Sequence, residues 1–390
     1  MKRGKAANRL IDFYLGIPVL NLLACFRSPR EFPRDPKRIG ILLNPALGDT
    51  LLASAAVQDI RGIWPGAKLI LFADAPNLAA AELLPSIDEI EKLPITHPLE
   101  AVRVLRRNRL DLLLDFTAWQ RITALFTLMS GASFTVGYTR KKQHRHRGYD
   151  QCAEHLGDCH ELENLRRFTR SLGARTHCAP RLVIPDGPLP EVVSKAGKLV
   201  VFHAWASGAR SWLREWPDAC WAALARSLST PDRTFLLTGS AADSARCYSL
   251  RQAMRADGTR VEVLIGQDGI AGVARVLKQA ELLVSVNTGI MHLGAILGVP
   301  TVSLDGPTAS HRWGPIGPHV ASVRPGDGSG GFLDLGFEYR GHLENVMNKI
   351  SVDAVLQAVE AVCDLKQQPT GSRNNSVVAQ RTCAAVSSSG

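Results

Sequence analysis

Apolar runs alternate with amphipathic segments from residue 38 onward, with lengths typical of strands and helices. The run RIGILL, residues 38–43, is apolar and predicts a buried strand. A helix is predicted from Asp49 to about Trp64, followed by strands in PGAKLILFAD and in LDLLLDF, which begins at Leu110. The segment RITALFTLMSGA predicts a helix that ends at a glycine. This order of elements indicates a parallel sheet covered by helices.

A second alternating set follows a proline-rich stretch, PRLVIPDGPLPEVV, which is typical of a linker. Strands are predicted in KLVVFHAWA, RTFLLTGS, VEVLIG, ELLVSV and PTVSLDG, and helices in WPDACWAALARSLS, IAGVARVLKQA and IMHLGAILG. We therefore predict an α/β protein with two Rossmann-like doubly wound domains that face each other across a cleft. The predicted parts are an N-terminal segment (1–37), an N-terminal domain (38–180), a linker (181–197), a C-terminal domain (198–366) and a disordered polar tail (367–390).

The N-terminal segment begins with basic residues and contains an apolar run from Phe13 to Phe26. The run is interrupted and is shorter than the roughly 20 residues that a membrane-spanning helix needs. No small-residue cleavage site follows it, which argues against a signal peptide. Two interpretations stay open: a helix packed on the body of the protein, or an interfacial segment that binds lipid phosphates. The cations of the second interpretation are Lys2, Arg3, Lys5 and Arg9.

Composition and charge narrow the class of protein. The 390 residues are 45% hydrophobic and 21% charged, as in globular rather than disordered proteins, and the length suggests two domains. The formal charge of +10 favours an anionic partner, either nucleic acid, a membrane surface or a phosphorylated small molecule. Aromatic residues make up only 6% and are not interleaved with the basic run, so we expect no nucleic-acid binding.

The eight cysteines show no pairing rhythm, which fits a reducing compartment such as the cytoplasm. The stretch CAEHLGDCH would place several possible metal ligands on one helical face, but it lacks the Cys-x-x-Cys spacing of a zinc site. We favour half-buried cysteines and surface histidines, and we expect neither a metal nor a cofactor. The residues concerned are Cys152, His155, Cys159 and His160.

Two stretches in the second half predict anion binding. In the first, a strand ends at Asn287, the turn is Thr288–Gly289, and a helix with His292 one turn inside starts at once. Backbone amides at such a helix start bind phosphate, and a glycine allows close approach of a ligand. In the second, Arg210 and Arg214 precede a helix, where two guanidinium groups can hold a diphosphate as it leaves. An ordinary strand–helix junction and two solvated arginines are the alternatives.

These stretches together resemble glycosyltransferase family 9, the heptosyltransferases of lipopolysaccharide core assembly, over roughly residues 38 to 360. GDTLLASAAVQDIR resembles the family's N-terminal Gly-Asp motif and LREWP its Lys/Arg-x-Trp-Pro element. VNTGIMHLGAILGVPTVSLDGPT resembles its Asp-Thr-Gly-x-x-His-x-Ala signature, and RWGPIGP the end of that region. The resemblance implies a GT-B fold and inverting, metal-independent transfer. It also implies an ADP-heptose-like donor and a lipid-linked glycan acceptor at the inner face of the inner membrane.

The resemblance makes Asp49 the general base that takes the proton from the acceptor hydroxyl. A helix N-terminus favours the ionised carboxylate that a base requires. Capping of the helix is the alternative role, and the two are compatible.

Other site residues follow from the same resemblance. Asp243 is expected to contact ribose hydroxyls, and Gln267 and Asp268 to lie beside the base of the nucleotide. The basic run TRKKQHRHR is expected to meet phosphates of the acceptor. A solvated loop is the other interpretation of this run. Its candidate residues are Arg140, Lys141, Lys142 and Arg145.

Asn287 departs from the family signature, which usually has aspartate at this position. An amide keeps one acceptor oxygen, adds an NH₂ donor and removes a charge. We expect nucleotide binding to survive and the preferred sugar to change, with the amide facing one hydroxyl as acceptor and another as donor. The alternative is a non-catalytic GT-B protein that binds nucleotides or glycans.

Overall fold

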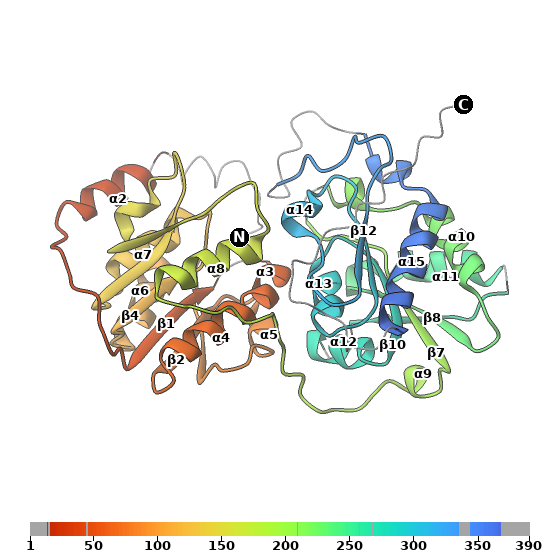
Figure 1. Ribbon diagram of the computed structural model, residues 1–390, viewed down its shortest axis with the longest axis horizontal. Helices are drawn as coiled ribbons and strands as arrows, with labels where there is room; N and C mark the ends of the chain where they lie inside the picture. The colour runs from red at the N-terminus through yellow and green to blue at the C-terminus, as the bar shows by residue number, and fades with distance from the viewer. Residues whose placement is uncertain are drawn as a thin grey trace. The chain divides into compact units, whose positions relative to one another are not determined.

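The computed structural model describes residues 14, 16–43, 46–208, 210–256, 258–266, 269–334 and 344–367. The chain divides into two compact units, Met1–Val183 and Ile184–Gly390 (Figure 1). The division lies within the stretch expected to be a linker. The basic residues of the first ten positions, Gln267 and Asp268, and the tail from residue 368 lie outside the described residues.

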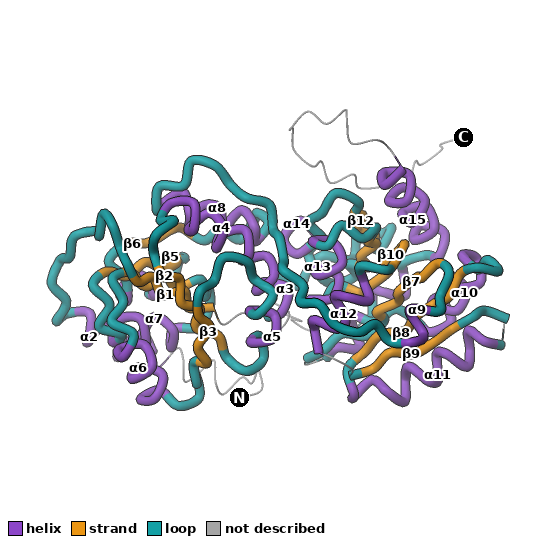
Figure 2. Tube along the Cα trace, turned by 90° about the horizontal axis from the view of Figure 1, so that it is seen from below, coloured by secondary structure: helices purple, strands orange, loops and turns teal. Residues whose placement is uncertain are grey.

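The first unit is built on a six-stranded parallel sheet in the order β3-β2-β1-β4-β5-β6. Figure 2 shows α4 and α8 on one side of this sheet and α6 and α7 on the other. The strands are β1 (Arg38–Leu43), β2 (Lys68–Ala73), β3 (Glu89–Lys92), β4 (Leu112–Asp115), β5 (Phe134–Thr139) and β6 (Gln151–Glu154). The helices are α2 (Gly16–Ala24), α3 (Leu47–Leu52), α4 (Ser54–Ile63), α5 (Leu78–Ala81), α6 (Pro98–Arg107), α7 (Arg121–Met129), η1 (Arg145–Gly148) and α8 (Glu161–Ser171).

The second unit has another six-stranded parallel sheet, in the order β12-β11-β10-β7-β8-β9. The strands are β7 (Lys198–His203), β8 (Arg233–Gly239), β9 (Val261–Ile265), β10 (Ala280–Val286), β11 (Thr301–Leu304) and β12 (Val320–Val323). The helices are α9 (Glu191–Ser194), η2 (Ser211–Arg214), α10 (Asp218–Leu228), η3 (Ala241–Asp243), α11 (Ser244–Arg255), α12 (Gly269–Leu277), α13 (Gly289–Ile296), α14 (Ser310–Trp313), η4 (Val346–Lys349) and α15 (Val352–Gln367).

Both units have the same winding. Counted from the first strand of each unit, both sheets read 3-2-1-4-5-6, so the strand order reverses between β1 and β4 and again between β7 and β10. In doubly wound sheets, ligands bind outside the carboxyl ends of the strands at this reversal point. The topology therefore marks one candidate binding edge in each unit.

The central strands were predictable because both of their faces are buried, which makes the sequence a nearly continuous apolar run. In β1, every residue after Arg38 is buried. The sequence-based prediction missed β3, β6 and β12, which are short strands at sheet edges and are only partly buried. It also missed the interior strand β5. Gly137 and the threonines of that strand break its apolar pattern, and a Cβ at residue 137 would lie 2.3 Å from the ring of Tyr149.

The single helix predicted from Asp49 to about Trp64 is two helices, α3 and α4, divided at Ala53. Helix α3 begins at Leu47, two residues earlier than predicted. Asp49 is therefore the third residue of α3, and its carboxylate lies within the first turn of the helix.

The N-terminal segment packs on the first unit through one face of α2. Leu20 is completely buried and contacts Ala124 and Tyr149. After the helix, Arg27 and Arg30 both pair with Asp150, at 2.5 and 3.0 Å. The interpretation of a packed helix therefore holds for this face. Within the described part of the chain, no helix combines the length and apolar character needed to cross a bilayer.

Candidate active site

Asp49 is half-buried in the first turn of α3, directly after β1. Its Oδ2 accepts a hydrogen bond from the amide of Ala46 at 3.1 Å, so the carboxylate caps the helix. Because β1 stands at the reversal point of the sheet, the same carboxylate lies at the candidate binding edge of the first unit. The capping role is observed, and the role as a base stays a prediction.

Three cations follow β5 at the same edge of the sheet. Arg140, at the end of β5, lies over the ring of Trp119, with 4.2 Å between the guanidinium carbon and the ring centroid. Trp119 follows β4, which pairs with both β1 and β5. Lys141 and Lys142 come next and are exposed. The carboxyl ends of parallel strands share one sheet edge, so a base candidate, an aromatic platform and three cations share this edge.

Arg145 does not belong to this group, and its prediction as an acceptor-binding residue is wrong. Its side chain is fully buried, and its Nη2 lies 2.8 Å from Asp115 Oδ2. Arg145 also donates to Tyr149 Oη, which in turn donates to Asp115 at 2.7 Å. A guanidinium held in this way stabilises the interior and does not meet a phosphate at the surface.

The stretch CAEHLGDCH is not helical, because Cys152 lies in β6 and the residues after Glu154 form a loop. The expectation of surface histidines is wrong for His155, which is 2% exposed and has its Nε2 3.0 Å from Glu161. His160 caps α8 by accepting from the amide of Leu162. Among the described residues, no group of three or more His, Cys, Asp or Glu side chains could hold a metal ion.

In the second unit, Arg210 and Arg214 follow β7. Arg210 is exposed and has a left-handed backbone, with φ of 54°. Arg214 is half-buried and donates a hydrogen bond to the carbonyl oxygen of Ser207, so it folds back over the loop. Its Nε is buried and has no hydrogen-bond partner among the described residues. This buried donor suits an anionic ligand that binds along the loop.

The tryptophan of the LREWP element is structural. Trp216 is buried, packs edge-on against Trp221 at 5.2 Å, and donates from Nε1 to the carbonyl oxygen of Ile350. These contacts hold the end of η2, which carries Arg214, against the core of the unit. The motif therefore combines a ligand candidate with the anchor that positions it.

The helix N-terminus predicted at Thr288–Gly289 is present. Thr288 is the N-cap of α13, and its side chain forms no capping hydrogen bond. The first amides of a helix have no intrahelical acceptor, which leaves them to a ligand. His292 is buried, and its amide bonds to the carbonyl oxygen of Thr288. Asn287 precedes this turn at the end of β10, beside the reversal point of the sheet.

Asp243 has a local structural role. Its Oδ2 accepts hydrogen bonds from the amide and hydroxyl of Ser240, at 3.0 and 2.6 Å. Its Oδ1 lies 3.7 Å from Arg246. The carboxylate therefore caps the turn that begins α11, and contact with a ribose stays a prediction.

His203, the last residue of β7, was not predicted as a site residue from the sequence. Its Nδ1 lies 3.0 Å from Thr238 Oγ1. Burial lowers the pKa of this imidazole from 6.5 to about 4, although the carboxylate of Asp243 opposes the shift. A polar residue that ends a buried strand at the reversal point was the available sequence signal.

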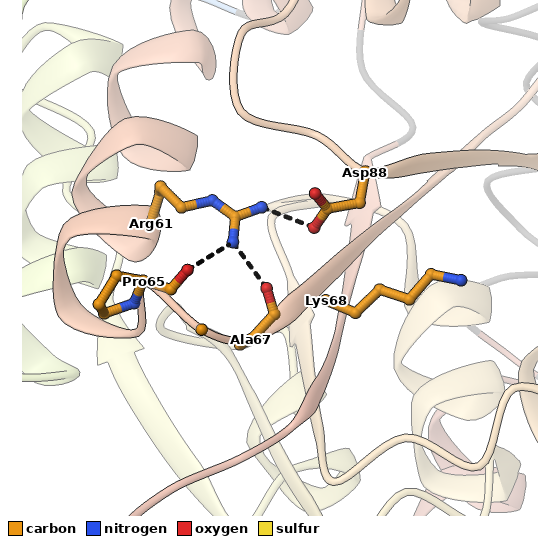
Figure 3. Close-up of a pocket in the computed structure, with 6 residues that line it drawn as sticks. Arg61, Pro65, Ala67, Lys68 and Asp88 are labelled. Atoms are coloured by element: carbon orange, nitrogen blue, oxygen red, sulfur yellow. Dashed lines mark hydrogen bonds and ion pairs between the residues drawn. The ribbon is translucent and has the colours of Figure 1, made fainter.

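A shallow pocket of about 420 Å³ lies elsewhere, at the amino end of β2 (Figure 3). Arg61 crosses it and lies 2.6 Å from Asp88, and it also donates to the carbonyl oxygen of Ala67. Asp88 accepts the amide of Leu69 at 2.7 Å. Arg61 and Asp88 pair with each other and Lys68 pairs with Glu89, all at the edge opposite to Asp49, so we do not assign this pocket to the active site.

Comparison with known proteins identifies the family. The family model for glycosyltransferase family 9 (heptosyltransferase) matches residues 99–328, more than half of the chain. Lipopolysaccharide heptosyltransferase 1 of Escherichia coli is 27% identical over 290 residues, which cover 70% of this chain and 88% of the relative. The same enzyme of Pseudomonas aeruginosa is 34% identical over 139 residues, covering 32% and 36% of the two chains.

Solved structures agree on the fold. A family 9 glycosyltransferase from Veillonella parvula superposes with a TM-score of 0.68 at 18% identity, covering 86% of this chain and 99% of the other. The E. coli ADP-heptose heptosyltransferase II gives 0.68 at 18% identity, with 85% and 100% covered. The predicted α/β fold of GT-B type, with two Rossmann-like units, is confirmed. The chain belongs to glycosyltransferase family 9, the heptosyltransferase family, and is a glycosyltransferase.

Proposed function

We propose that the chain transfers a heptose-like sugar from an ADP-heptose-like donor to a lipopolysaccharide-core or related lipid-linked glycan acceptor, with inversion and without a metal. One observation carries this proposal: in each unit, candidate residues gather at the reversal point of a doubly wound sheet. The candidate residue at this point of the first unit is Asp49, and those of the second unit are Arg214 and Asn287. The names of the relatives supply the sugar and the acceptor class.

In the proposed reaction, the acceptor hydroxyl oxygen attacks the anomeric carbon of the donor sugar. The bond between that carbon and the diphosphate oxygen breaks, and Asp49 takes the hydroxyl proton. Attack from the side opposite the leaving group inverts the anomeric centre. Asp49 is suited to this role because the N-terminal turn of α3 stabilises its ionised form.

The departing nucleoside diphosphate gains negative charge, which the second unit is suited to neutralise. Arg214 supplies a buried guanidinium N–H group, and the N-terminus of α13 supplies backbone amides beside Gly289. Arg210 supplies a second, exposed cation. Two arginines and a helix terminus can perform the neutralisation that a divalent cation performs in other transferases.

For the acceptor, we propose that Arg140, Lys141 and Lys142 bind its anionic groups. Their edge of the sheet also carries Asp49, and Trp119 holds Arg140 in place. A lipid-linked acceptor requires the protein to work at a membrane surface. We therefore propose a cytoplasmic protein that associates peripherally with the inner face of the inner membrane.

The exposed face of α2 supports this membrane association. On α2, Val19 and Leu22 are 42 and 63% exposed. Phe26 in the turn after the helix is 81% exposed, and Tyr14 before it is 67% exposed. The opposite face packs on α7 and η1. In η1, against which α2 packs, Arg147 is an exposed cation. An apolar stripe beside basic side chains is typical of helices that lie in an anionic bilayer interface.

The purified full-length protein, ADP-heptose and a deacylated core oligosaccharide test the reaction. We expect a product one heptose heavier by mass spectrometry, with an inverted anomeric configuration by NMR and an unchanged rate in EDTA. Retention of configuration or complete inhibition by EDTA would contradict the mechanism. Tight binding of ADP without any turnover on core acceptors would instead support the alternative, a non-catalytic GT-B nucleotide- or glycan-binding protein.

A further inference from the structure

Asn287 is tied to a buried carboxylate by its amide nitrogen. Its Nδ2 donates to Asp305 Oδ1 at 2.7 Å and to the carbonyl oxygen of Trp313 at 2.9 Å. Asp305 follows β11, and Val286 and Leu304 are partners in the parallel pairing of β10 with β11. The amide and the carboxylate are therefore adjacent at the carboxyl edge of the second sheet.

Asp305 is held firmly in this position. It is completely buried, and its Oδ1 also accepts the hydroxyl of Ser303 at 2.5 Å. Its own amide donates to the carbonyl oxygen of Val323 at 2.8 Å. Burial raises the pKa of the Asp305 carboxyl, while hydrogen bonds from Ser303, Ser322 and Asn287 and the positive charge of Arg324 oppose the rise. Because Oδ1 receives two donors, it acts as an acceptor whether or not the other oxygen carries a proton.

These contacts determine which way the amide of Asn287 points. A side-chain amide has two N–H groups and one carbonyl oxygen, and neighbouring groups decide their placement. Both neighbours of this amide are acceptors, so the NH₂ group must face them and both of its hydrogens are used. Among the described residues, none donates a hydrogen bond to Asn287 Oδ1. The expectation that this amide serves a sugar as both donor and acceptor is therefore wrong.

We propose that Asp305 is a positioning residue that fixes Asn287, so that its neutral carbonyl oxygen alone accepts a hydroxyl of the donor sugar. This inference rests on the proposed function, because Asn287 directly precedes the helix terminus assigned to the diphosphate. The arrangement places a neutral acceptor at residue 287, and the carboxylate that orients it belongs to Asp305. A charged acceptor at residue 287 would repel that group.

The binding test compares two ligands, ADP and ADP-heptose, by calorimetry. In Asp305→Leu, which is similar in size, the amide loses the acceptor that orients it. We expect ADP-heptose affinity to fall about five- to ten-fold, the effect of roughly one hydrogen bond, and ADP affinity to stay within two-fold. Ser303→Ala is the matched control, because it disturbs the same buried carboxylate without contacting Asn287. Equal losses for both ligands, or no loss for either, would overturn the proposal.

The stability test needs no ligand, so it separates this proposal from the proposed function. Asn287→Asp places two carboxyl groups at the 2.7 Å contact, where one must keep a proton. A raised pKa in the folded state gives stability at low pH that is lost as the pH rises. We expect the melting temperature of Asn287→Asp, relative to the native protein, to fall between pH 4 and 8. The reciprocal double variant Asn287→Asp/Asp305→Asn should recover part of that loss.

Equal pH profiles for Asn287→Asp and the native protein would show that the two side chains do not form the pair, and would overturn the proposal even if Asp305→Leu does not fold. Failure of the native protein to bind ADP-heptose, with the pH-dependent loss intact, would overturn the sugar-binding role and the proposed donor while leaving the pair itself established.

Discussion

Arg145 Nη2 lies 2.8 Å from Asp115 Oδ2, and neither side chain is exposed to solvent. Thr123 and Tyr149 complete the environment, with hydrogen bonds from the guanidinium to both hydroxyl groups. The partners come from β4, α7 and the residue after η1, so this buried ion pair and its hydrogen bonds join η1 to β4 and α7. A basic residue in an apparently solvated run is therefore an interior residue.

Arg145→Met should lower the free energy of unfolding by about 3–5 kcal/mol, because it leaves the Asp115 carboxylate buried without its cation. Urea unfolding checks this value. The matched control is Lys141→Gln/Lys142→Gln, which changes exposed residues of the same run and should leave stability within about 0.5 kcal/mol. If the control lowers stability as much as Arg145→Met does, the separation of the run into buried and exposed cations fails.

Asp49→Asn should abolish transfer and leave ADP affinity within a few-fold, because the proposed role of the carboxylate is proton removal. Asparagine keeps an oxygen that can accept the amide of Ala46, so the cap on α3 survives and the fold should be unaffected. Turnover, calorimetry and thermal melting together check this prediction. Normal turnover in a folded variant would exclude Asp49 as the base.

Arg214→Ala should weaken ADP binding more than Arg210→Ala does, because Arg214 is positioned by Trp216 while Arg210 is exposed. Loss of a charged contact to the diphosphate should cost about 1.5–3 kcal/mol. Calorimetry with ADP measures both variants, and Arg226→Ala on α10 serves as a control outside the site. Equal, small effects of both substitutions would argue against a diphosphate clamp.

Leu22→Gln/Phe26→Gln should reduce binding to vesicles that contain anionic lipid and leave the melting temperature unchanged, because both side chains are exposed. Leu99→Gln is the control, since Leu99 is also exposed, at 71%, but lies on α6. Point variants are preferable to deletion of residues 1–30, which would also remove Leu20, Arg27 and Arg30 from their packed positions. Vesicle sedimentation at low and high salt checks the result. Unchanged binding of the double variant would show that α2 is not the membrane surface.

Stability should fall as the pH decreases from about 6.5 to about 4, in part because of His203. The unfolded chain takes up a proton at this imidazole in that range, while the folded chain holds it neutral, so acid favours unfolding. His203→Gln should make the dependence of the melting temperature on pH shallower in this window. Parallel profiles for the two proteins would mean that His203 does not titrate with a lowered pKa.

The sequence alone predicted the strands at the reversal point of each sheet, β1, β4, β7 and β10, and the helices that follow them. Parallel strands covered on both faces must be apolar throughout, and this local pattern is visible in RIGILL or ELLVSV without any knowledge of their partners. The helix start at Thr288–Gly289 was also visible, because it depends only on residues that are adjacent in sequence. Edge strands β3, β6 and β12 escaped because partial burial removes the apolar pattern.

Only the tertiary structure decided the state of individual side chains. Arg145 and Lys142 are three residues apart in one basic run, yet the first is buried because Asp115, thirty residues away in sequence, faces it. Asn287 points its NH₂ group inward because Asp305, eighteen residues away, accepts it. A residue's type fixes which hydrogen bonds it can form. Which of them it does form depends on partners that the fold brings together from distant parts of the chain.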